Sequence, residues 1–171
     1  NRILLSSVLA GEKSADDIVL NSLDWYEKHG IRLRLGVRIT DVDAERKIVT
    51  GDDGSVTPFD KLLFATGSSP FIPPIDGVKQ EGVYAFRNLD DTRALLGRAG
   101  RGVKAVVIGG GLLGLEAARG LQVQGCDVTV IHLMETLMER QLDVTGGSYL
   151  KAKMECLSVR VLLGRHTAAI L

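Results

Sequence analysis

The stretch "VVIGGGLLGLEAA", residues 106–118, constrains the fold more than any other part of this chain. Three adjacent glycines separate an apolar run from a helical pattern, although each glycine inside a regular element costs roughly 0.5–1 kcal/mol relative to alanine. Gly109, Gly111 and Gly114 have the spacing Gly-x-Gly-x-x-Gly. The first permits a tight turn, the second lets the backbone approach a pyrophosphate, and the third lets the helix lie against the strand. The stretch therefore predicts a strand, a turn and a helix that together bind a dinucleotide.

The residues around this motif alternate between strand-like and helix-like patterns. "VKAVVIGGG" and "CDVTVIH" read as strands on either side of the helical "LLGLEAARGLQVQG". Asp143 can cap a further helix that runs to about Met154, and "VRVLL" adds a third strand. Strands that alternate with helices predict right-handed βαβ units and a parallel sheet. This context favours a nucleotide site over the alternative of a glycine turn with no ligand.

His132 stands at the end of the second of these strands. An acidic residue there would bind the adenosine ribose of NAD, and an arginine nearby would accommodate a 2′-phosphate. Histidine is neither, so His132 is expected to face the ribose in place of the acid, while Glu135 and Arg140, which follow closely, could each serve instead. The sequence therefore predicts a nicotinamide dinucleotide, NAD(P)H, and leaves open which form is preferred. A methyltransferase remains as a remote alternative.

The first half of the chain predicts different elements. A helix is expected over residues 14–30, with a capping-box start at Ser14 and Asp17 and a stop at Gly30. After it come a strand "IRLRL" and an antiparallel meander with a turn at Asp53-Gly54. The apolar run from Leu62 to Ala65 predicts a strand that is buried on both faces. A further helix is expected from Asp90 to Ala99. The prolines in "SSPFIPPIDG" indicate a linker or domain boundary.

Composition excludes several classes of protein. The 171 residues suit one domain or two small ones, and 21 basic residues balance 21 acidic ones, so no net field favours nucleic acid or an anionic membrane. No apolar run approaches the ~20 residues of a membrane span, and no signal peptide opens the chain. Cys126 and Cys156 form no Cys-x-x-Cys pair, which favours a reducing cytoplasm. Because the sequence opens on Asn1, we expect an internal piece of a longer chain.

"FDKLLFATGSSPFIPP" resembles the second flavin-contacting signature of two-dinucleotide-binding flavoprotein reductases. Within that superfamily, "NRILLSSVLAGE", "LNSLDWYEKHGI", "GGGLLGLEAARGL" and "LMERQLDVTGGSYLKAKME" look like the large flavin-bearing subunit of NAD(P)H-dependent nitrite reductases. The resemblance covers essentially the whole chain. It implies an α/β, Rossmann-like flavoprotein architecture, with a parallel sheet of βαβ units plus an antiparallel meander, truncated at both ends. It also implies a partial FAD-binding domain over 1–76 and a partial NAD(P)-binding domain over 77–171.

The resemblance implies an enzyme that passes electrons from NAD(P)H to FAD and then, through an iron–sulfur cluster and sirohaem, to nitrite, which becomes ammonium. Those last two groups would lie in a C-terminal part beyond this sequence, because two isolated cysteines cannot ligate a cluster that wants four thiolates. A small subunit is the implied partner. The alternatives are a reductase of rubredoxin or ferredoxin, an NADH oxidase, and a non-catalytic dinucleotide-binding module.

The resemblance also assigns site residues, although it assigns no catalytic base, nucleophile or metal ligand. Glu116 matches an acid that lies near the nicotinamide ribose and the flavin edge. The flavin side is represented by Thr66 and Gly67 in the Ala-Thr-Gly turn, by Arg2, and by Val37 near the adenine. If the piece is made alone, the strand from Leu62 to Ala65 lacks its parallel neighbour, so we expect self-association. We also expect weak FAD binding, because the resemblance implies that the phosphate-cradling turn of the flavin site lies upstream of Asn1.

Overall fold

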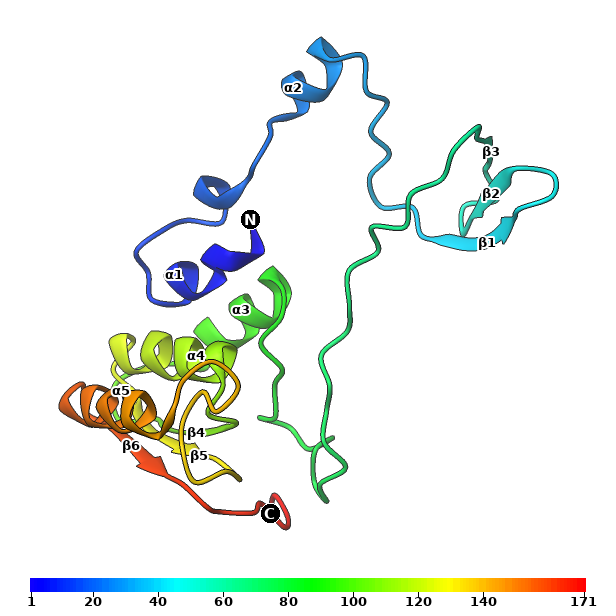
Figure 1. The fold of residues 1–171 in the computed structure, drawn as a ribbon. Coiled ribbons are helices and arrows are strands. Elements are labelled where there is room, and N and C mark those ends of the chain that lie inside the picture. Colours follow the sequence, from blue (N-terminus) through cyan, green and yellow to red (C-terminus); the bar gives the residue numbers. More distant parts are fainter. The chain divides into compact units, whose positions relative to one another are not determined.

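The computed structural model describes residues 1–171, which form two compact units (Figure 1). The larger unit combines residues 1–19 with 69–171, and the smaller unit contains residues 20–68. The break between Ser68 and Ser69 lies at the start of the proline-containing segment that the sequence predicts as a linker. Residues 69–75 form neither helix nor strand, as expected. The cofactor-domain boundary between residues 76 and 77 stays a prediction.

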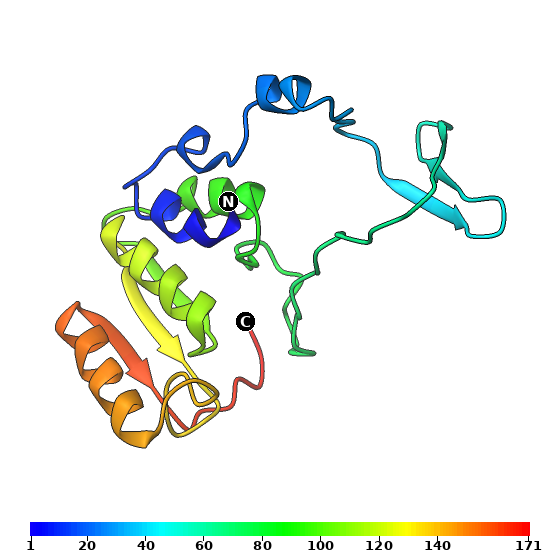
Figure 2. The same cartoon turned by 45° about the horizontal axis from the view of Figure 1, so that its top comes forward.

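The larger unit is built on a parallel three-stranded sheet with strand order β4-β5-β6. Each connection between successive strands is a helix, so the predicted βαβ units and the α/β class are confirmed. Figures 1 and 2 show the two connecting helices beside the strands. The elements are β4 (Lys104–Ile108), α4 (Leu112–Val123), β5 (Asp127–Ile131), α5 (Val144–Cys156) and β6 (Val159–Leu162).

The parallel sheet buries one face and leaves the other exposed. Val128 and Val130 of β5 are 0% exposed, and they pair in register with the buried Val159 and Val161 of β6. On β4 the side chains alternate, and Val106 is 61% exposed. The strand before the glycines is therefore half-buried on one face and exposed on the other. The buried face carries the main hydrophobic core, beneath α4 and α5.

The short helix α1 (Leu5–Leu9) packs against α4, and η1 (Arg2–Leu4) and α3 (Leu89–Leu96) pack against α1. The fully buried Leu9 of α1 lies against Gly120, where a Cβ would come within 2.7 Å of the Leu9 side chain. Gly120 therefore lets α1 and α4 approach closely.

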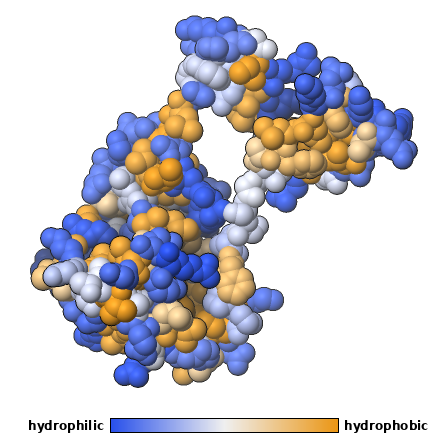
Figure 3. All heavy atoms as spheres, in the orientation of Figure 1, coloured by the Kyte–Doolittle hydropathy of each residue, from blue (hydrophilic) through white to orange (hydrophobic).

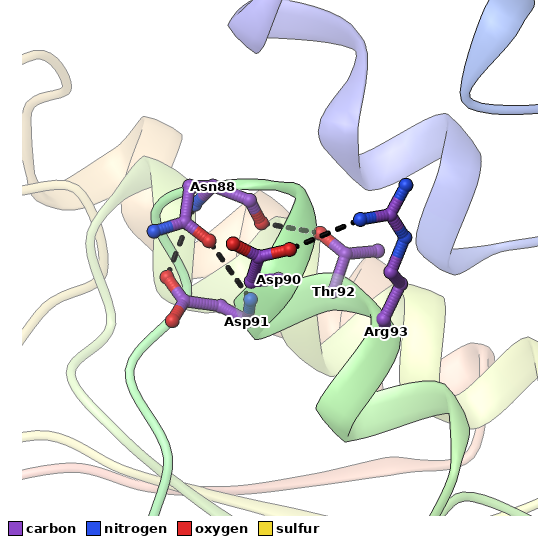
Figure 4. Close-up of polar contacts among 5 residues, drawn as sticks. All are labelled: Asn88, Asp90, Asp91, Thr92 and Arg93. Atoms are coloured by element: carbon purple, nitrogen blue, oxygen red, sulfur yellow. Dashed lines mark hydrogen bonds and ion pairs between the residues drawn. The ribbon is translucent and has the colours of Figure 1, made fainter. Parts of the chain in front are cut away.

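Helix α3 begins with a complete capping box, shown in Figure 4. The Asn88 side chain accepts from the Asp91 N–H at 2.9 Å, and the Asp91 carboxylate accepts from the Asn88 N–H at 3.0 Å. The fully buried Thr92 donates its hydroxyl to the Asn88 carbonyl at 2.8 Å. These bonds satisfy backbone groups that a helix start otherwise leaves without partners. The predicted helix over Asp90–Ala99 is confirmed, with slightly earlier bounds.

The smaller unit contains the predicted antiparallel meander. Its strands are β1 (Ile39–Asp43), β2 (Ile48–Gly51) and β3 (Val56–Pro58). The predicted turn lies between β2 and β3, where Gly54 has a φ of +79°. The space-filling view shows apolar side chains at the surface of this meander (Figure 3), and they include Ile39 and Val56.

Three sequence-based expectations in the first half are wrong. Residues 14–30 do not form one helix: a short η2 (Asp16–Ile18) and α2 (Leu23–Lys28) are separated by residues 19–22, which bend and form neither helix nor strand. The capping pair of Ser14 and Asp17 does form, but Ser22 provides a second cap that starts α2 anew. Gly30, with a φ of +66°, follows the end of α2 as expected.

Residues 31–35 and 62–65 form no strand. Leu63 and Phe64 are 86% and 68% exposed, which contradicts the prediction that this run is buried on both faces. The sheet of the smaller unit contains only β1, β2 and β3, so neither segment pairs with a strand of that unit. An apolar run becomes a strand only where another strand supplies that ladder.

Candidate functional site

The glycine turn lies between β4 and α4, at the carboxyl end of the parallel strands. Gly109 continues the sheet, because its N–H donates to the Ile131 carbonyl at 2.9 Å. Its φ of +120° lies in a region that side chains rarely adopt. The chain can therefore turn sharply here only because residue 109 is a glycine. Open α/β sheets bind their ligands at this edge.

Gly111 is the N-cap of α4, and no side chain caps this helix. A Cβ at Gly111 would meet no atom within 4 Å, so the space above its backbone is open. The first N–H groups of a helix lack intrahelical acceptors, and the helix dipole places partial positive charge beside them. The start of α4 can therefore receive an anionic group against bare backbone.

Gly114 is the point where α4 touches the turn. A Cβ at this residue would lie 2.1 Å from the Gly109 carbonyl oxygen, well inside van der Waals contact. Only a glycine therefore allows the first turn of the helix to pack so close to the end of β4. The three predicted glycines are brought together, each in a position that suits its expected part in the motif.

His132 follows β5 and is only 8% exposed. The Gly110 N–H donates to its Nδ1 at 3.1 Å, and its Nε2 lies 3.1 Å from Oε2 of Glu139. The pKa of Glu139 is lowered, first by its own backbone N–H and then by the hydrogen bond from His132. The predicted contact between His132 and a ribose stays a prediction, and both ring nitrogens already have partners within the chain.

Glu116 lies one turn into α4 and faces a hollow of about 440 Å³. Apolar side chains of Leu112, Leu115 and Met138 form part of its lining. Burial raises the pKa of the Glu116 carboxyl, and a hydrogen bond from Ser6 partly offsets that effect. Ser6 belongs to α1, so the two sequence segments that form the larger unit meet at this carboxyl.

The predicted flavin-side residues lie in both units. Arg2 is exposed in η1 and lines a second hollow of about 300 Å³, together with Leu5 and Leu89 of the larger unit. Thr66, Gly67 and Val37 lie in the smaller unit. Gly67 has a φ of +71° and open space at its Cβ position, which fits a backbone approach to a ligand.

Sequence reasoning missed Gly110 and Glu139. A Cβ at Gly110 would lie 2.6 Å from Cδ2 of Leu137 and 2.7 Å from Cγ of His132, so the middle glycine is required by packing. The available signal for Gly110 was the run of three adjacent glycines, since the Gly-x-Gly motif allows any residue at the middle position. No pattern marks Glu139, because it follows His132 through an irregular loop.

The glycine turn and its surroundings offer groups that can bind a ligand. No group of three or more His, Cys, Asp or Glu side chains is placed to hold a metal ion. None of the helices is long and apolar enough to cross a membrane. The turn provides backbone donors and open space, and Glu116 provides a carboxyl whose pKa is raised.

Known proteins resemble this chain in both sequence and structure. The chain is 50% identical, over 99% of its length, to the "Assimilatory nitrate reductase electron transfer subunit" and to "Nitrite reductase [NAD(P)H]" of Bacillus subtilis (strain 168). It covers only 22% and 21% of these relatives, about a fifth of their length. The crystal structure of NADH:rubredoxin oxidoreductase from Clostridium acetobutylicum is similar with a TM-score of 0.81 and 29% identity, over 98% of this chain and 44% of that one.

The sequence also matches a family profile along nearly its whole length. The match runs over residues 1–170 and so includes the glycine turn, the βαβ units and the meander. The chain belongs to the pyridine nucleotide-disulphide oxidoreductase family.

Proposed function

We propose that this chain binds NAD(P)H at the turn of Gly109, Gly111 and Gly114 and directs its electrons to FAD, as part of a flavin-dependent oxidoreductase. The observation that carries the proposal is the open backbone of Gly111 at the uncapped start of α4. A pyrophosphate placed there would accept hydrogen bonds from N–H groups that have no acceptor within the helix. The bound nucleotide would supply the hydride, and the protein would hold and orient it.

The remaining site residues are assigned by position. Glu116 would lie toward the nicotinamide ribose, on the helix that follows the phosphate-binding turn. Thr66, Gly67, Arg2 and Val37 would contribute to the flavin site. In this proposal residues 1–76 are part of an FAD-binding domain, and residues 77–171 are part of an NAD(P)-binding domain.

The final electron acceptor is proposed to be nitrite, which the full-length protein would reduce to ammonium. Nitrite is favoured as the acceptor because the relative named "Nitrite reductase [NAD(P)H]" is 50% identical to this chain. An "NADH-rubredoxin oxidoreductase" is only 32% identical, over 92% of the chain. Sirohaem and an iron–sulfur cluster would be held by other parts of the full-length protein, with a small subunit as a possible partner. We place the protein in the reducing cytoplasm, where Cys126 and Cys156 remain free thiols.

Nucleotide binding is tested by titrating the protein with NADH and NADPH and comparing two matched variants. Gly111→Val places a side chain in the space proposed for the pyrophosphate and should abolish binding. Gly100→Val is the control, because its Cβ likewise meets no atom within 4 Å and it lies outside the turn. Equal affinity in the wild type and Gly111→Val would reject the site.

The acceptor is tested separately, by following NAD(P)H oxidation in the full-length protein with nitrite, rubredoxin or ferredoxin. Stoichiometric ammonium formation supports nitrite reduction. Rapid reduction of a small carrier without ammonium formation would favour the flavoprotein reductase alternative. Nucleotide binding with no electron transfer to flavin or any acceptor would favour a non-catalytic module.

A further inference from the structure

The imidazole of His132 lies between the backbone N–H of Gly110 and the carboxylate of Glu139, and these two contacts define its tautomer. A backbone N–H can only donate, so the contact from Gly110 requires Nδ1 to be the unprotonated ring nitrogen. The ring proton then lies on Nε2, which donates to the Glu139 carboxylate. The side chain is almost fully buried, and its ring is held at both nitrogens.

The peptide of Gly110 is held from both sides by the segment that follows β5. Its N–H donates to the His132 ring, and its carbonyl accepts from the Met138 N–H at 3.1 Å. The fully buried Leu137 packs against its Cα, where a side chain would not fit. Gly110 is thereby fixed, although glycine is the most mobile residue type, and its neighbours Gly109 and Gly111 are fixed with it.

We propose that His132 is a positioning residue for the phosphate-binding turn. Its Nδ1 accepts from Gly110 and its Nε2–H is anchored by Glu139, so the turn is held in the conformation that presents the start of α4 to a pyrophosphate. In this arrangement no ring nitrogen remains to contact a ribose hydroxyl. The proposal rests on the proposed nucleotide function, and it replaces the ribose contact expected from the sequence.

A positioning role and a ribose role predict different nucleotide selectivity. The pyrophosphate is common to NADH and NADPH, so loosening the turn should weaken the binding of both nucleotides by the same factor. A side chain that contacts the ribose lies beside the 2′ position, where the two nucleotides differ, so its removal should change the ratio of their affinities.

Two polar substitutions separate the functions of the two ring nitrogens. In His132→Asn the amide can reach the position of Nδ1, so an acceptor for Gly110 is retained and the contact with Glu139 is lost. In His132→Gln the amide reaches toward the position of Nε2, so the contact with Glu139 is retained and Gly110 loses its acceptor. Each variant keeps a buried amide and one of the two contacts, so they serve as controls for each other.

The experiment measures NADH and NADPH dissociation constants of the wild type and both variants. Loss of one buried hydrogen bond predicts about tenfold weaker binding of both nucleotides by His132→Gln. We expect His132→Asn to stay within about threefold of the wild type, because the Gly110 bond is rescued. Equal losses in the two variants, a greater loss in His132→Asn, or a change in the NADH to NADPH ratio would overturn the proposal.

The tautomer gives a readout that needs no bound nucleotide. In the nitrogen-15 spectrum of labelled histidine, His132 should show a protonated Nε2 and an unprotonated Nδ1. A ring protonated at Nδ1 would also overturn the proposal. If the tautomer is as expected but the wild type binds neither nucleotide, the proposed function fails, and the positioning role fails with it. If the wild type binds and His132→Gln is unchanged, only the positioning role fails.

Discussion

The carbonyl oxygen of Gly109 lies 2.1 Å from the position that a Cβ would take at Gly114. This contact joins the end of β4 to the first turn of α4 and leaves no room for a methyl group. Gly114→Ala must therefore move the helix away from the strand. Overpacking of this kind costs about 1–3 kcal/mol.

We expect Gly114→Ala to lower the free energy of unfolding by that amount and to weaken NAD(P)H binding as well. Urea denaturation and nucleotide titration measure the two effects. Gly100→Ala is the stability control, since its Cβ enters open space. A Gly114→Ala protein with wild-type stability and affinity would show that the helix can shift without disturbing the turn.

The capping box of α3 should make a measurable contribution to stability. Asn88→Ala removes the side-chain acceptor of the Asp91 N–H and should cost about 1 kcal/mol. The ion pair of Asp90 and Arg93 in the same turn is exposed, so Asp90→Asn should change stability by less than about 0.5 kcal/mol. Figure 4 shows both contacts side by side. Chemical denaturation of the two variants gives the comparison, and equal losses would contradict the assignment.

The one-sided burial of the parallel sheet predicts different costs for the same substitution on its two faces. Val128 is fully buried and Val106 is 61% exposed. Val128→Ala should destabilise the fold by about 2 kcal/mol, from two lost carbon atoms at roughly 0.8 kcal/mol each plus a residual cavity. Val106→Ala should cost less than about 0.5 kcal/mol. Comparable losses would contradict the one-sided burial of the sheet.

The features that sequence reasoning found correctly are determined by nearby residues. The turn at Gly109 depends on backbone freedom that only glycine gives, and it lies between two strongly patterned segments. Helix α5 begins where Asp143 offers its carboxylate to the Gly146 N–H at 2.7 Å, as its position before the helical pattern predicted. Local chemistry of this kind can be read directly from the order of residues.

The features that sequence reasoning missed depend on partners far along the chain. The run from Leu62 to Ala65 has a strand-like composition, but no strand of its unit offers a ladder to it. The contact of His132 with Glu139 depends on how an irregular loop returns to the sheet, and no periodicity specifies that path. The position of His132 after β5 predicts a place beside the ribose, whereas its hydrogen-bond partners within the chain cannot be derived from that position.

Because Glu116 is partly buried, its contribution to the free energy of unfolding should depend on pH. Because burial raises the pKa of this carboxyl above its value in the unfolded chain, the ionised form is less favourable in the folded protein. The contribution of Glu116 to stability is therefore greatest below the unfolded pKa and is lost as pH rises through the raised folded pKa. At pH 7 the charged carboxylate is a net cost.

Glu116→Gln should therefore stabilise the protein at pH 7 by up to roughly 0.5 kcal/mol, a modest value because the group is partly exposed to water. The amide can still accept a hydrogen bond from Ser6. The gain should disappear as the pH falls below the ordinary pKa of a glutamate, where the wild-type carboxyl is also neutral. Thermal unfolding from pH 3.5 to 7 measures this, with Glu12→Gln as the control because Glu12 lines the same hollow and is exposed. A constant difference across that range would mean that the Glu116 carboxyl reaches water as freely in the folded protein as in the unfolded chain.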